Sequence, residues 1–373
     1  MTPEMPVLIK KNVSSTNVYC VAIVILLLYH LGFLSPLTAN LIQSEANGRA
    51  STHCSKVATP DFASLSDEPV FVNQSTRVPL CQCQIQLPQV YSTHSSFEDT
   101  TCSATAFARG DHQRVVGFSF YGDSRSPKHK SKQYYQGIID NLGLMNKFYP
   151  GWIMRLYFDL NLGDDLLGSL CELSCQNANL DLCHIQHLPG TPLPNASRIF
   201  PMNWRFFPTL DPQVDLFVSR DLDSRFSDRE QSAVQEWLNS KWAFHMMRDH
   251  PAHVVSILGS GWGVKLTSTE IRSQWKSAWM IGKNSPIMWA TRGMTGPDQG
   301  FLKRFVWPWA KKDSIQHDSY TCQVFPGTLG FPTPRKNEPD NFIASVVAQN
   351  MSIWKICPYQ CRREGHRLDW IYC

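Results

Sequence analysis

The feature that most constrains this chain is the alternation of apolar runs and amphipathic stretches between residues 114 and 219. The short apolar runs have the character of strands, and the longer stretches between the first three have apolar side chains at helical spacing. Strands are therefore expected at 114–120, 152–158, 180–185 and from Val214, and helices at 133–147 and 164–176. This order predicts an α/β fold with a parallel sheet flanked by helices. Ligands of such sheets bind at the carboxyl ends of the strands.

The strand from Val214 runs directly into a turn with two carboxylates, in the sequence V-D-L-F-V-S-R-D-L-D-S-R. Asp221 and Asp223 stand two residues apart, so their side chains share one side of an extended segment and a turn lets their oxygens converge. Mg²⁺ or Mn²⁺ held by one or two carboxylates keeps positions for phosphate oxygens. Such pairs also occur in solvated turns, but the position after a central strand favours a metal site.

Two helices and a glycine-rich segment are expected beyond this turn. The helix patterns cover 227–238, which opens with a capping box, and 268–282. Between them, three glycines surround Trp262, namely Gly259, Gly261 and Gly263. Glycines let the backbone approach a ligand closely, although a tight buried turn is the alternative. The Trp262 ring is a candidate for stacking on a ligand.

Two further polar residues are candidates for the site. Asp298 stands at the start of a short predicted helix, where it could act as a general base or serve only as an N-cap. His317 could be a third metal ligand, or it could have a structural or solvated role. Three cationic side chains near the turn, Arg220, Arg225 and Lys265, could face a diphosphate, whereas salt bridges that frame the turn are the alternative for the two arginines.

The N-terminal region predicts a membrane anchor. Residues 18–34 are strongly apolar and just long enough to cross a bilayer, by the criterion of about 17–25 residues. Lys10 and Lys11 precede them, so the positive-inside rule leaves a tail, 1–17, in the cytosol and the rest in the lumen. A cleaved signal peptide is the alternative. A polar lumenal stem is expected at 35–110 and the folded domain at 111–373.

Cysteine content and charge agree with a lumenal address. The chain has 12 cysteines, and all but Cys20 lie beyond the anchor. In an oxidising lumen they favour disulfides over zinc ligation, and their odd number there leaves one thiol free or bridged to another chain. Asn73, Asn195 and Asn350 stand in glycosylation sequons. The net charge of +4 is too small and too dispersed to indicate nucleic-acid binding.

Two segments resemble a group of animal Golgi glycosyltransferases with the GT-A, Rossmann-like fold, which implies a mixed, mostly parallel sheet flanked by helices. They are Asp211-Pro-Gln-Val-Asp-Leu-Phe-Val-Ser-Arg-Asp-Leu-Asp-Ser-Arg and Arg248-Asp-His-Pro. The resemblance covers roughly 114–345 and includes the order of anchor, stem, sheet and Asp-x-Asp turn. It implies that Asp221 and Asp223 hold the metal and that the donor nucleotide contacts Phe120 and Tyr121. It also implies an acceptor-side carboxylate at Asp298 and a late metal-binding histidine, which would be His317.

The implied activity is the metal-dependent transfer of a hexose or related sugar from a nucleotide-sugar donor, UDP- or GDP-linked, to a glycan, protein or lipid. The implied cofactor is Mn²⁺ or Mg²⁺, and the expected location is the Golgi membrane as a single-pass type II protein, with a secreted form as an alternative. Val264 and Lys265 follow Trp262-Gly263 where some inverting enzymes have W-G-x-E-D, so the stereochemistry stays open. A catalytically inactive glycan-binding or scaffold relative and a lumenal metal-dependent hydrolase are the alternatives.

Overall fold

The computed structural model describes residues 81, 83, 96–122, 128–159, 164–190, 196–289, 296–336, 342–347 and 355–373. All of them belong to the compact unit Thr76–Cys373. The predicted tail 1–17, the predicted anchor 18–34, most of the predicted stem 35–110 and the three sequon asparagines lie outside the described residues. Within the described part of the chain, no helix combines the length and the apolar character needed to cross a bilayer.

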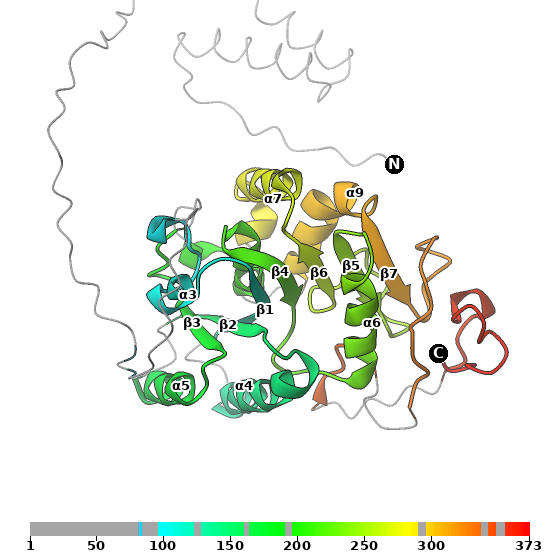
Figure 1. Cartoon of the computed structure of the whole chain (residues 1–373), viewed down its shortest axis with the longest axis horizontal. Helices are drawn as coiled ribbons and strands as arrows, with labels where there is room; N and C mark the ends of the chain where they lie inside the picture. The colour runs from blue at the N-terminus through cyan, green and yellow to red at the C-terminus, as the bar shows by residue number, and fades with distance from the viewer. Residues whose placement is uncertain are drawn as a thin grey trace, which may run out of the picture. The chain divides into compact units, whose positions relative to one another are not determined.

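A seven-stranded sheet with the order β3-β2-β1-β4-β6-β5-β7 forms the centre of this unit (Figure 1). The strands are β1 (Gln113–Phe120), β2 (Ile153–Phe158), β3 (Leu180–His184), β4 (Val214–Ser219), β5 (Phe244–Arg248), β6 (Trp262–Lys265) and β7 (Ser314–Asp318). Strand β6 is antiparallel to β4 and β5, and the other neighbouring pairs are parallel. The predicted mixed, mostly parallel sheet is therefore confirmed.

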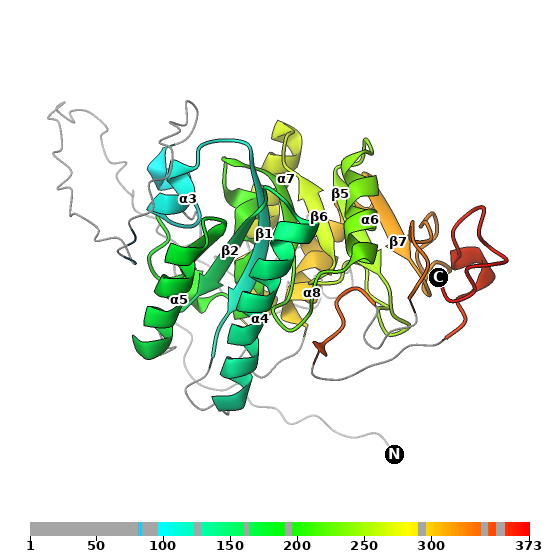
Figure 2. The ribbon, with the colours of Figure 1, turned by 60° about the horizontal axis from the view of Figure 1, so that its bottom comes forward.

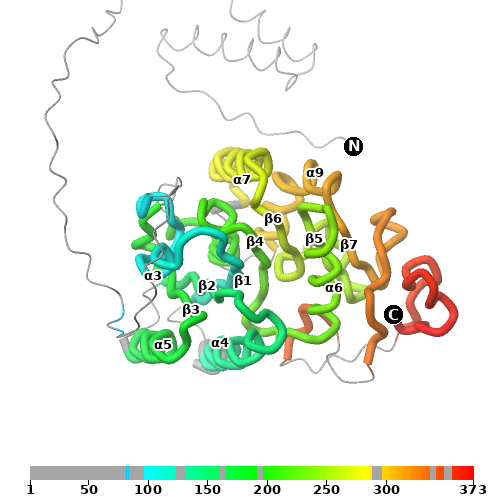
Figure 3. Tube along the Cα trace, in the orientation of Figure 1, coloured from blue at the N-terminus to red at the C-terminus, as the bar shows by residue number. Residues whose placement is uncertain are grey.

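Helices cover both faces of the sheet (Figures 1 and 2). One face carries α4 (Lys128–Phe148), α5 (Asp164–Gln176) and α6 (Asp228–Leu238). The other carries α3 (Ala104–Ala108), the 3₁₀ segment η4 (Pro201–Leu210), α7 (Thr269–Gly282), α8 (Pro297–Phe301) and α9 (Trp307–Ala310). The tube in Figure 3 shows α7 and α9 on the side opposite α4 and α5. Shorter elements are η1 (Phe97–Asp99), η3 (Ala196–Arg198), η5 (Pro286–Trp289), the π-helical η6 (Leu302–Val306) and η8 (Tyr359–Cys361).

Two apolar clusters, one on each face, explain why the central strands read as nearly continuous apolar runs. In β1, Val116, Phe118 and Phe120 pack into the cluster under α4, α5 and α6. Val115 belongs to the opposite cluster, which also contains Trp275 and the other aromatic side chains of η4 and α7. A strand that is buried on both faces needs apolar side chains at successive positions, so strict alternation with polar residues is lost.

The segment 96–110, which the sequence places at the end of the stem, packs onto the sheet. Thr100 Oγ1 and the backbone N–H of Thr101 donate to Asp211 Oδ2 over 2.9 and 3.0 Å. The buried guanidinium of Arg155 donates to the same oxygen over 2.7 Å. Asp211, at the end of η4, therefore ties this lead-in to β2 through charge-assisted hydrogen bonds.

Disulfides brace both ends of the unit, as the cysteine content predicts. Among the described residues, they join Cys81 to Cys171, Cys83 to Cys175, Cys102 to Cys183, Cys322 to Cys361 and Cys357 to Cys373. The first three connect the lead-in with α5 and β3, and the last two hold the C-terminal segment. These pairings agree with the preference for disulfides over zinc ligation.

Candidate active site

Three of the predicted site residues gather at the edge of the sheet where β1 and β4 end. These strands are parallel neighbours, so their carboxyl ends share this edge. Tyr121 follows β1, and Asp221 and Asp223 lie in the turn after β4. The ring of Tyr121 packs edge-on against Trp204, with centroids 6.1 Å apart. Phe120 instead points into the apolar cluster below the sheet, so of the two predicted nucleotide contacts only Tyr121 borders the site.

Helix α4 holds the Asp-x-Asp turn in place. Asp140 of α4 accepts from Arg225 Nη2 over 2.7 Å, and Arg225 Nη1 donates to the carbonyl of Leu222 over 2.9 Å. A side chain at Gly137 would overlap that same carbonyl, so only glycine lets the turn approach the helix. The amide of Asn141, one helical turn further on, donates to the carbonyl of Ser224 over 3.0 Å. The turn therefore rests on one face of α4.

Two of the three predicted cationic side chains, Arg220 and Arg225, frame the turn, and Lys265 lies elsewhere. Arg220 is buried, and its Nη2 lies 3.2 Å from Glu230 Oε2. Its Nη1 donates to the carbonyl of Ser260 over 3.1 Å. Lys265 Nζ donates to main-chain carbonyls at the end of α6, at distances of 3.2 and 2.6 Å. Together with the Arg225–Asp140 pair, the contacts of Arg220 match the structural alternative for the two arginines.

A fourth cation, Arg205 of η4, lies at the centre of the site. Its Nη1 is bonded to Asp221 Oδ1, and its Nη2 donates to Asp298 Oδ2 over 2.6 Å. The Arg205 side chain is 3% exposed, and that of Asp298 is 1% exposed, whereas Asp221 is 30% exposed. One guanidinium therefore joins a buried carboxylate of α8 to a partly open carboxylate after β4. Sequence reasoning missed Arg205, whose one signal is a cation inside the apolar run 204–207.

The local sequence makes room for this guanidinium. The backbone N–H of Arg205 donates to Ser119 Oγ over 3.0 Å. An added Cβ at Gly117 of β1 would overlap the Arg205 carbonyl, and one at Gly259 would overlap Asp298 Oδ2 and lie 2.7 Å from Arg205 Nη2. The glycine-rich segment before β6 therefore encloses the Arg205–Asp298 pair. This is the tight buried turn that was the alternative to ligand contact.

The charges at this edge are only partly compensated. Burial and the nearby charge of Asp221 raise the pKa of Asp223 to about 6. Burial also raises the pKa of Asp298, although Arg205 opposes the shift. The pKa of Tyr121 is raised by burial too, and the charges of Asp221 and Asp298 add to the rise. Burial is thus the main reason that these three acidic groups hold their protons more tightly than they would in water, and Arg205 opposes the shift in each case.

Tyr134 of α4 is a second phenol at this site, and sequence reasoning missed it. Burial raises its pKa, and the charges of Asp223 and Asp221 raise it further, so its hydroxyl stays protonated beside the acidic turn. Tyr134 precedes Gly137 by three positions and Asn141 by seven, which puts all three on the α4 face that carries the turn. A helix-face analysis of α4 against the turn could have found it.

His317, the predicted third metal ligand, lies elsewhere. It is buried on β7, with Nδ1 2.8 Å from Nε2 of His245 and Nε2 3.1 Å from Oε2 of Glu236. Burial lowers the pKa of His317, while Glu236 opposes the shift. The described residues contain no group of three or more His, Cys, Asp or Glu that could hold a metal ion, so His317 is not brought together with Asp221 and Asp223. Its contacts match the structural alternative.

Trp262 is also a core residue in the structure. Its ring is fully buried and stacks on Trp275 at a centroid distance of 5.3 Å, with the rings of Phe206 and Phe217 at 5.3 and 5.2 Å. No face of the indole is open to a sugar, so the predicted stacking role is not available in this conformation. Position 262 lies inside β6, where the apolar cluster takes up the large side chain.

The residues after β4 fit a hard divalent cation without a third protein ligand. Burial and the charge of Asp221 raise the pKa of Asp223, and a cation beside it would favour the ionised form. Asp221 keeps one carboxylate oxygen outside its contact with Arg205 and is 30% exposed. Carboxylate oxygens are the donors that Mg²⁺ and Mn²⁺ prefer, and one or two of them suffice where phosphates complete the shell.

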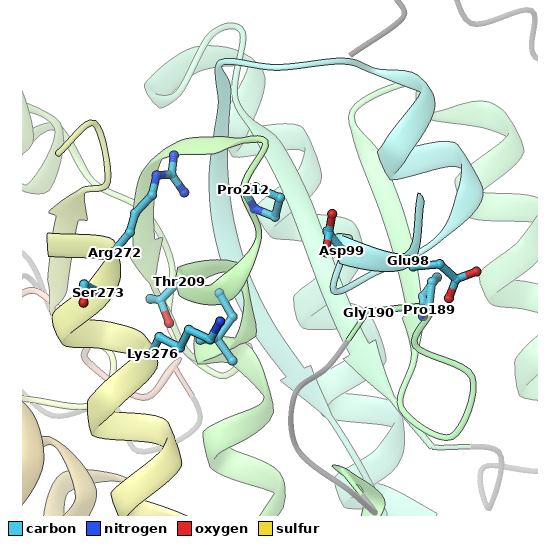
Figure 4. Close-up of a pocket in the computed structure, with 10 residues that line it drawn as sticks. Glu98, Asp99, Pro189, Gly190, Thr209, Pro212, Arg272, Ser273 and Lys276 are labelled. Carbon is cyan, nitrogen blue, oxygen red and sulfur yellow. The ribbon is translucent and has the colours of Figure 1, made fainter. Parts of the chain in front are cut away.

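A separate cavity of about 680 Å³ lies between η1, the end of η4 and α7 (Figure 4). Thr209 and Pro212, which line it, precede β4, so it faces the amino end of that strand, whereas the acidic turn follows the carboxyl end. Glu98, Asp99 and Lys276 line it as well, with charges of both signs. None of the predicted site residues borders it.

Fold and site together describe a mixed α/β protein with an acidic turn and a buried arginine at the strand ends. Comparison of the chain with protein-family models and with curated proteins gives no match. The functional argument therefore depends on the chemistry of the site.

Proposed function

We propose that the chain is a metal-dependent glycosyltransferase of the GT-A type, which transfers a hexose or related sugar from a nucleotide-sugar donor to an acceptor. The observation that carries the proposal is the convergence of Asp221 and Asp298 on the buried Arg205, beside Asp223 and Tyr121. This group lies at the carboxyl ends of parallel strands, where α/β sheets bind nucleotides. The mixed, mostly parallel sheet agrees with the fold that the resemblance implies.

The leaving group of such a reaction is a nucleoside diphosphate, whose developing negative charge must be stabilised. Bound at Asp221 and Asp223, Mn²⁺ or Mg²⁺ supplies Lewis-acid stabilisation of that charge. The carboxylates themselves bind the cation, and the partial exposure of Asp221 keeps that side open to a ligand. The neutral phenol of Tyr121 is a hydrogen-bond donor for oxygens of the donor substrate.

Arg205 has two roles in this proposal. It orients Asp221, and its positive charge, held at a buried position, stabilises anionic groups without reorganisation. Asp298, which the sequence predicts as an acceptor-side base, is 1% exposed and bound to Arg205. We therefore assign Asp298 to the positioning of Arg205, because a carboxylate so deeply buried does not reach an acceptor hydroxyl. Whether the configuration of the anomeric carbon is inverted or retained depends on the groups that bind the acceptor.

The decisive experiment measures thermal unfolding of the disulfide-intact lumenal part with a panel of nucleoside diphosphates, with and without Mn²⁺. A ligand at 100 times its Kd stabilises the folded state by about 2.7 kcal/mol, which corresponds to a Tm increase on the order of 5 °C. We expect one nucleotide to give such an increase only when Mn²⁺ is present. Loss of the increase in Asp223→Asn, but not in the exposed control Asp369→Asn, assigns it to the acidic turn.

One observation favours an inactive relative as the second candidate. Arg205 Nη1 donates to one carboxylate oxygen of Asp221, so its positive charge stands where a metal ion could otherwise bind. A glycan-binding or scaffold protein of this kind would keep the fold and show no metal-dependent nucleotide shift for any member of the panel. The hydrolase alternative needs more ligands than the described residues bring together, and we do not propose it.

A lumenal site in the secretory pathway completes the proposal. The described disulfides are typical of proteins that fold in an oxidising compartment. The Golgi address and the type II orientation depend on residues 18–34, which lie outside the described part of the chain. Microscopy of the full-length chain, with protease protection of its C-terminal part in intact vesicles, tests both.

A further inference from the structure

The motif Arg248-Asp-His-Pro has no role in the site described so far, yet it stands at the same edge of the sheet. It begins with the last residue of β5, which pairs with β6, and β6 pairs with β4. Two successive antiparallel pairings make β5 run parallel to β4, so the carboxyl ends of both strands face the same way. The motif therefore follows β5 as the acidic turn follows β4.

Asp249 of this motif is a fully buried hub for the C-terminal part of the chain. Its Oδ1 accepts from Arg229 Nη2 over 2.9 Å, from Arg335 Nη2 over 2.7 Å and from Ser319 Oγ over 2.6 Å. Its Oδ2 accepts from the backbone N–H of Ile343 over 3.1 Å. Although burial opposes ionisation, the two arginines lower the pKa of Asp249 to about 2, so it stays charged. This carboxylate holds α6, β7 and the segment 342–347 together.

The segment 342–347 is held firmly at its first residues. The ring of Phe342 packs against His250 and His253, with centroids 4.7 and 5.9 Å away. Phe342 and Ile343 are buried, and Ala344 has a left-handed backbone with φ of 66°. Residues other than glycine adopt this conformation only where their surroundings hold them in it. The contacts of Asp249 and the two histidines supply those surroundings.

The other end of this segment reaches the proposed metal site. The backbone N–H of Val347 donates to the carbonyl oxygen of Asp223 over 3.0 Å. Both atoms of this hydrogen bond belong to the main chain, and the Val347 side chain is 45% exposed. Figure 2 shows the segment as a short red-orange piece, set apart from the disulfide-held C-terminal end. Asp223 is thus held through its own carbonyl by a segment more than a hundred residues further along the chain.

We propose that the segment 342–347 positions the turn that binds the metal and the diphosphate. The Arg248-Asp-His-Pro motif fixes the first residues of this segment. Asp249 and the histidine pair place the first residues of the segment, and Val347 then fixes the backbone at Asp223. The carboxylate of Asp223 depends on this backbone for its direction. Among the described residues, the hydrogen bonds between α4 and the turn are made with Ser224 and Arg225, and Tyr134 of α4 lies beside the two carboxylates. This inference rests on the proposed function for its ligand.

The matched pair Val347→Pro and Val347→Ala tests the inference in the full disulfide-bonded chain. Proline removes the N–H donor, whereas alanine shortens the exposed side chain and keeps the donor. Near-UV circular dichroism establishes that each variant is folded. Hydrogen exchange of the peptide 219–225, followed by mass spectrometry, is expected to be about 3- to 10-fold faster in Val347→Pro than in Val347→Ala, as loss of one hydrogen bond implies. Equal exchange in the two variants overturns the inference.

Ligand binding separates this inference from the proposed function. If the wild-type chain binds a nucleotide with Mn²⁺, its Kd is expected to rise by about 3- to 10-fold in Val347→Pro and to be unchanged in Val347→Ala. An unchanged Kd in Val347→Pro overturns the positioning role and leaves the proposed function intact. If the wild type binds no nucleotide, the proposed function fails, and the exchange of peptide 219–225 still decides whether the segment fixes the turn.

Phe342→Ala provides a second route if Val347→Pro does not fold. It removes the ring that packs against His250 and His253 and keeps every backbone donor of the segment. Faster exchange of peptide 219–225 in this variant supports the inference, because Phe342 has no contact of its own with the acidic turn among the described interactions. Exchange as slow as in the wild type overturns it.

Discussion

Replacing Asp223 by asparagine is expected to stabilise the metal-free protein at neutral pH while it abolishes Mn²⁺-dependent nucleotide binding. Burial and the charge of Asp221 raise the pKa of Asp223 from 3.8 to about 6 in the folded state. The folded state therefore binds a proton more tightly than the unfolded state between these values. The corresponding contribution to stability is complete below pH 3.8 and is lost as the pH rises through about 6.

The magnitude follows from the size of the shift. The difference between 3.8 and about 6 is about two pKa units, and each unit corresponds to about 1.36 kcal/mol. Because Asp223 is partly exposed, solvent screening reduces the effect to an expected value on the order of 2 kcal/mol. An asparagine side chain has nearly the same shape and carries no charge, so it should recover this amount above pH 6.

The assay is urea unfolding of wild type and Asp223→Asn at several pH values between 4 and 8, without metal. The free energy of unfolding of the variant is expected to exceed that of the wild type at pH 8, and the difference is expected to vanish toward pH 4. Any divergence in the control Asp369→Asn should have the opposite sign, because the hydrogen bond from His366 lowers the pKa of this exposed carboxylate. Parallel curves for wild type and Asp223→Asn would refute the electrostatic reasoning for the site.

Three other outcomes are expected. Arg205→Met should destabilise the fold by about 3–5 kcal/mol, because it leaves buried Asp298 without its counter-charge; urea unfolding measures the loss, and adding Asp298→Asn should restore part of it. Gly259→Ala should lower the Tm and weaken Mn²⁺-dependent nucleotide binding, because its Cβ overlaps Asp298; a normal Tm with normal affinity contradicts this. Burial lowers the pKa values of His245 and His317. The free energy of unfolding of the protein should therefore decrease as the pH falls below 6.5, because both imidazoles must then take up protons. His317→Gln should flatten that decline in pH-dependent thermal unfolding, and an unchanged slope excludes the pair as its source.

The strands and helices around the sheet were largely predictable. The helix predicted at 164–176 is α5, with the same bounds, and the first predicted strand differs from β1 by one residue. Ser227 caps α6 as predicted, with its side chain accepting from the backbone N–H of Glu230 over 3.3 Å. The carboxylate of Glu230 does not return to the cap, because it pairs with Arg220 and accepts from Tyr149. Local signals succeed here because periodicity and capping involve residues within one or two turns.

The site was predictable in part. The Asp pair and Tyr121 gather because each follows a strand of the parallel sheet, and the rule for strand ends applies to sequence directly. Arg205 was missed because its meaning comes from Asp221 and Asp298, which are 16 and 93 residues away. Trp262 was given a ligand role from its aromatic ring and the glycines around it, and His317 from its chemical type and the late position that the resemblance implies. Their burial in the core reflects the packing of neighbouring strands and helices.

The amino-acid sequence alone determined the order of strands and helices, the mostly parallel character of the sheet, and an acidic turn at the end of one strand. These features follow from periodicity, capping and turn chemistry within short windows. Only the tertiary structure decided that the turn shares Arg205 with α8, that α4 supports it from one side, and that the segment 342–347 holds the carbonyl of Asp223. Such contacts join residues far apart in the chain, and packing of the whole unit determines which of them meet.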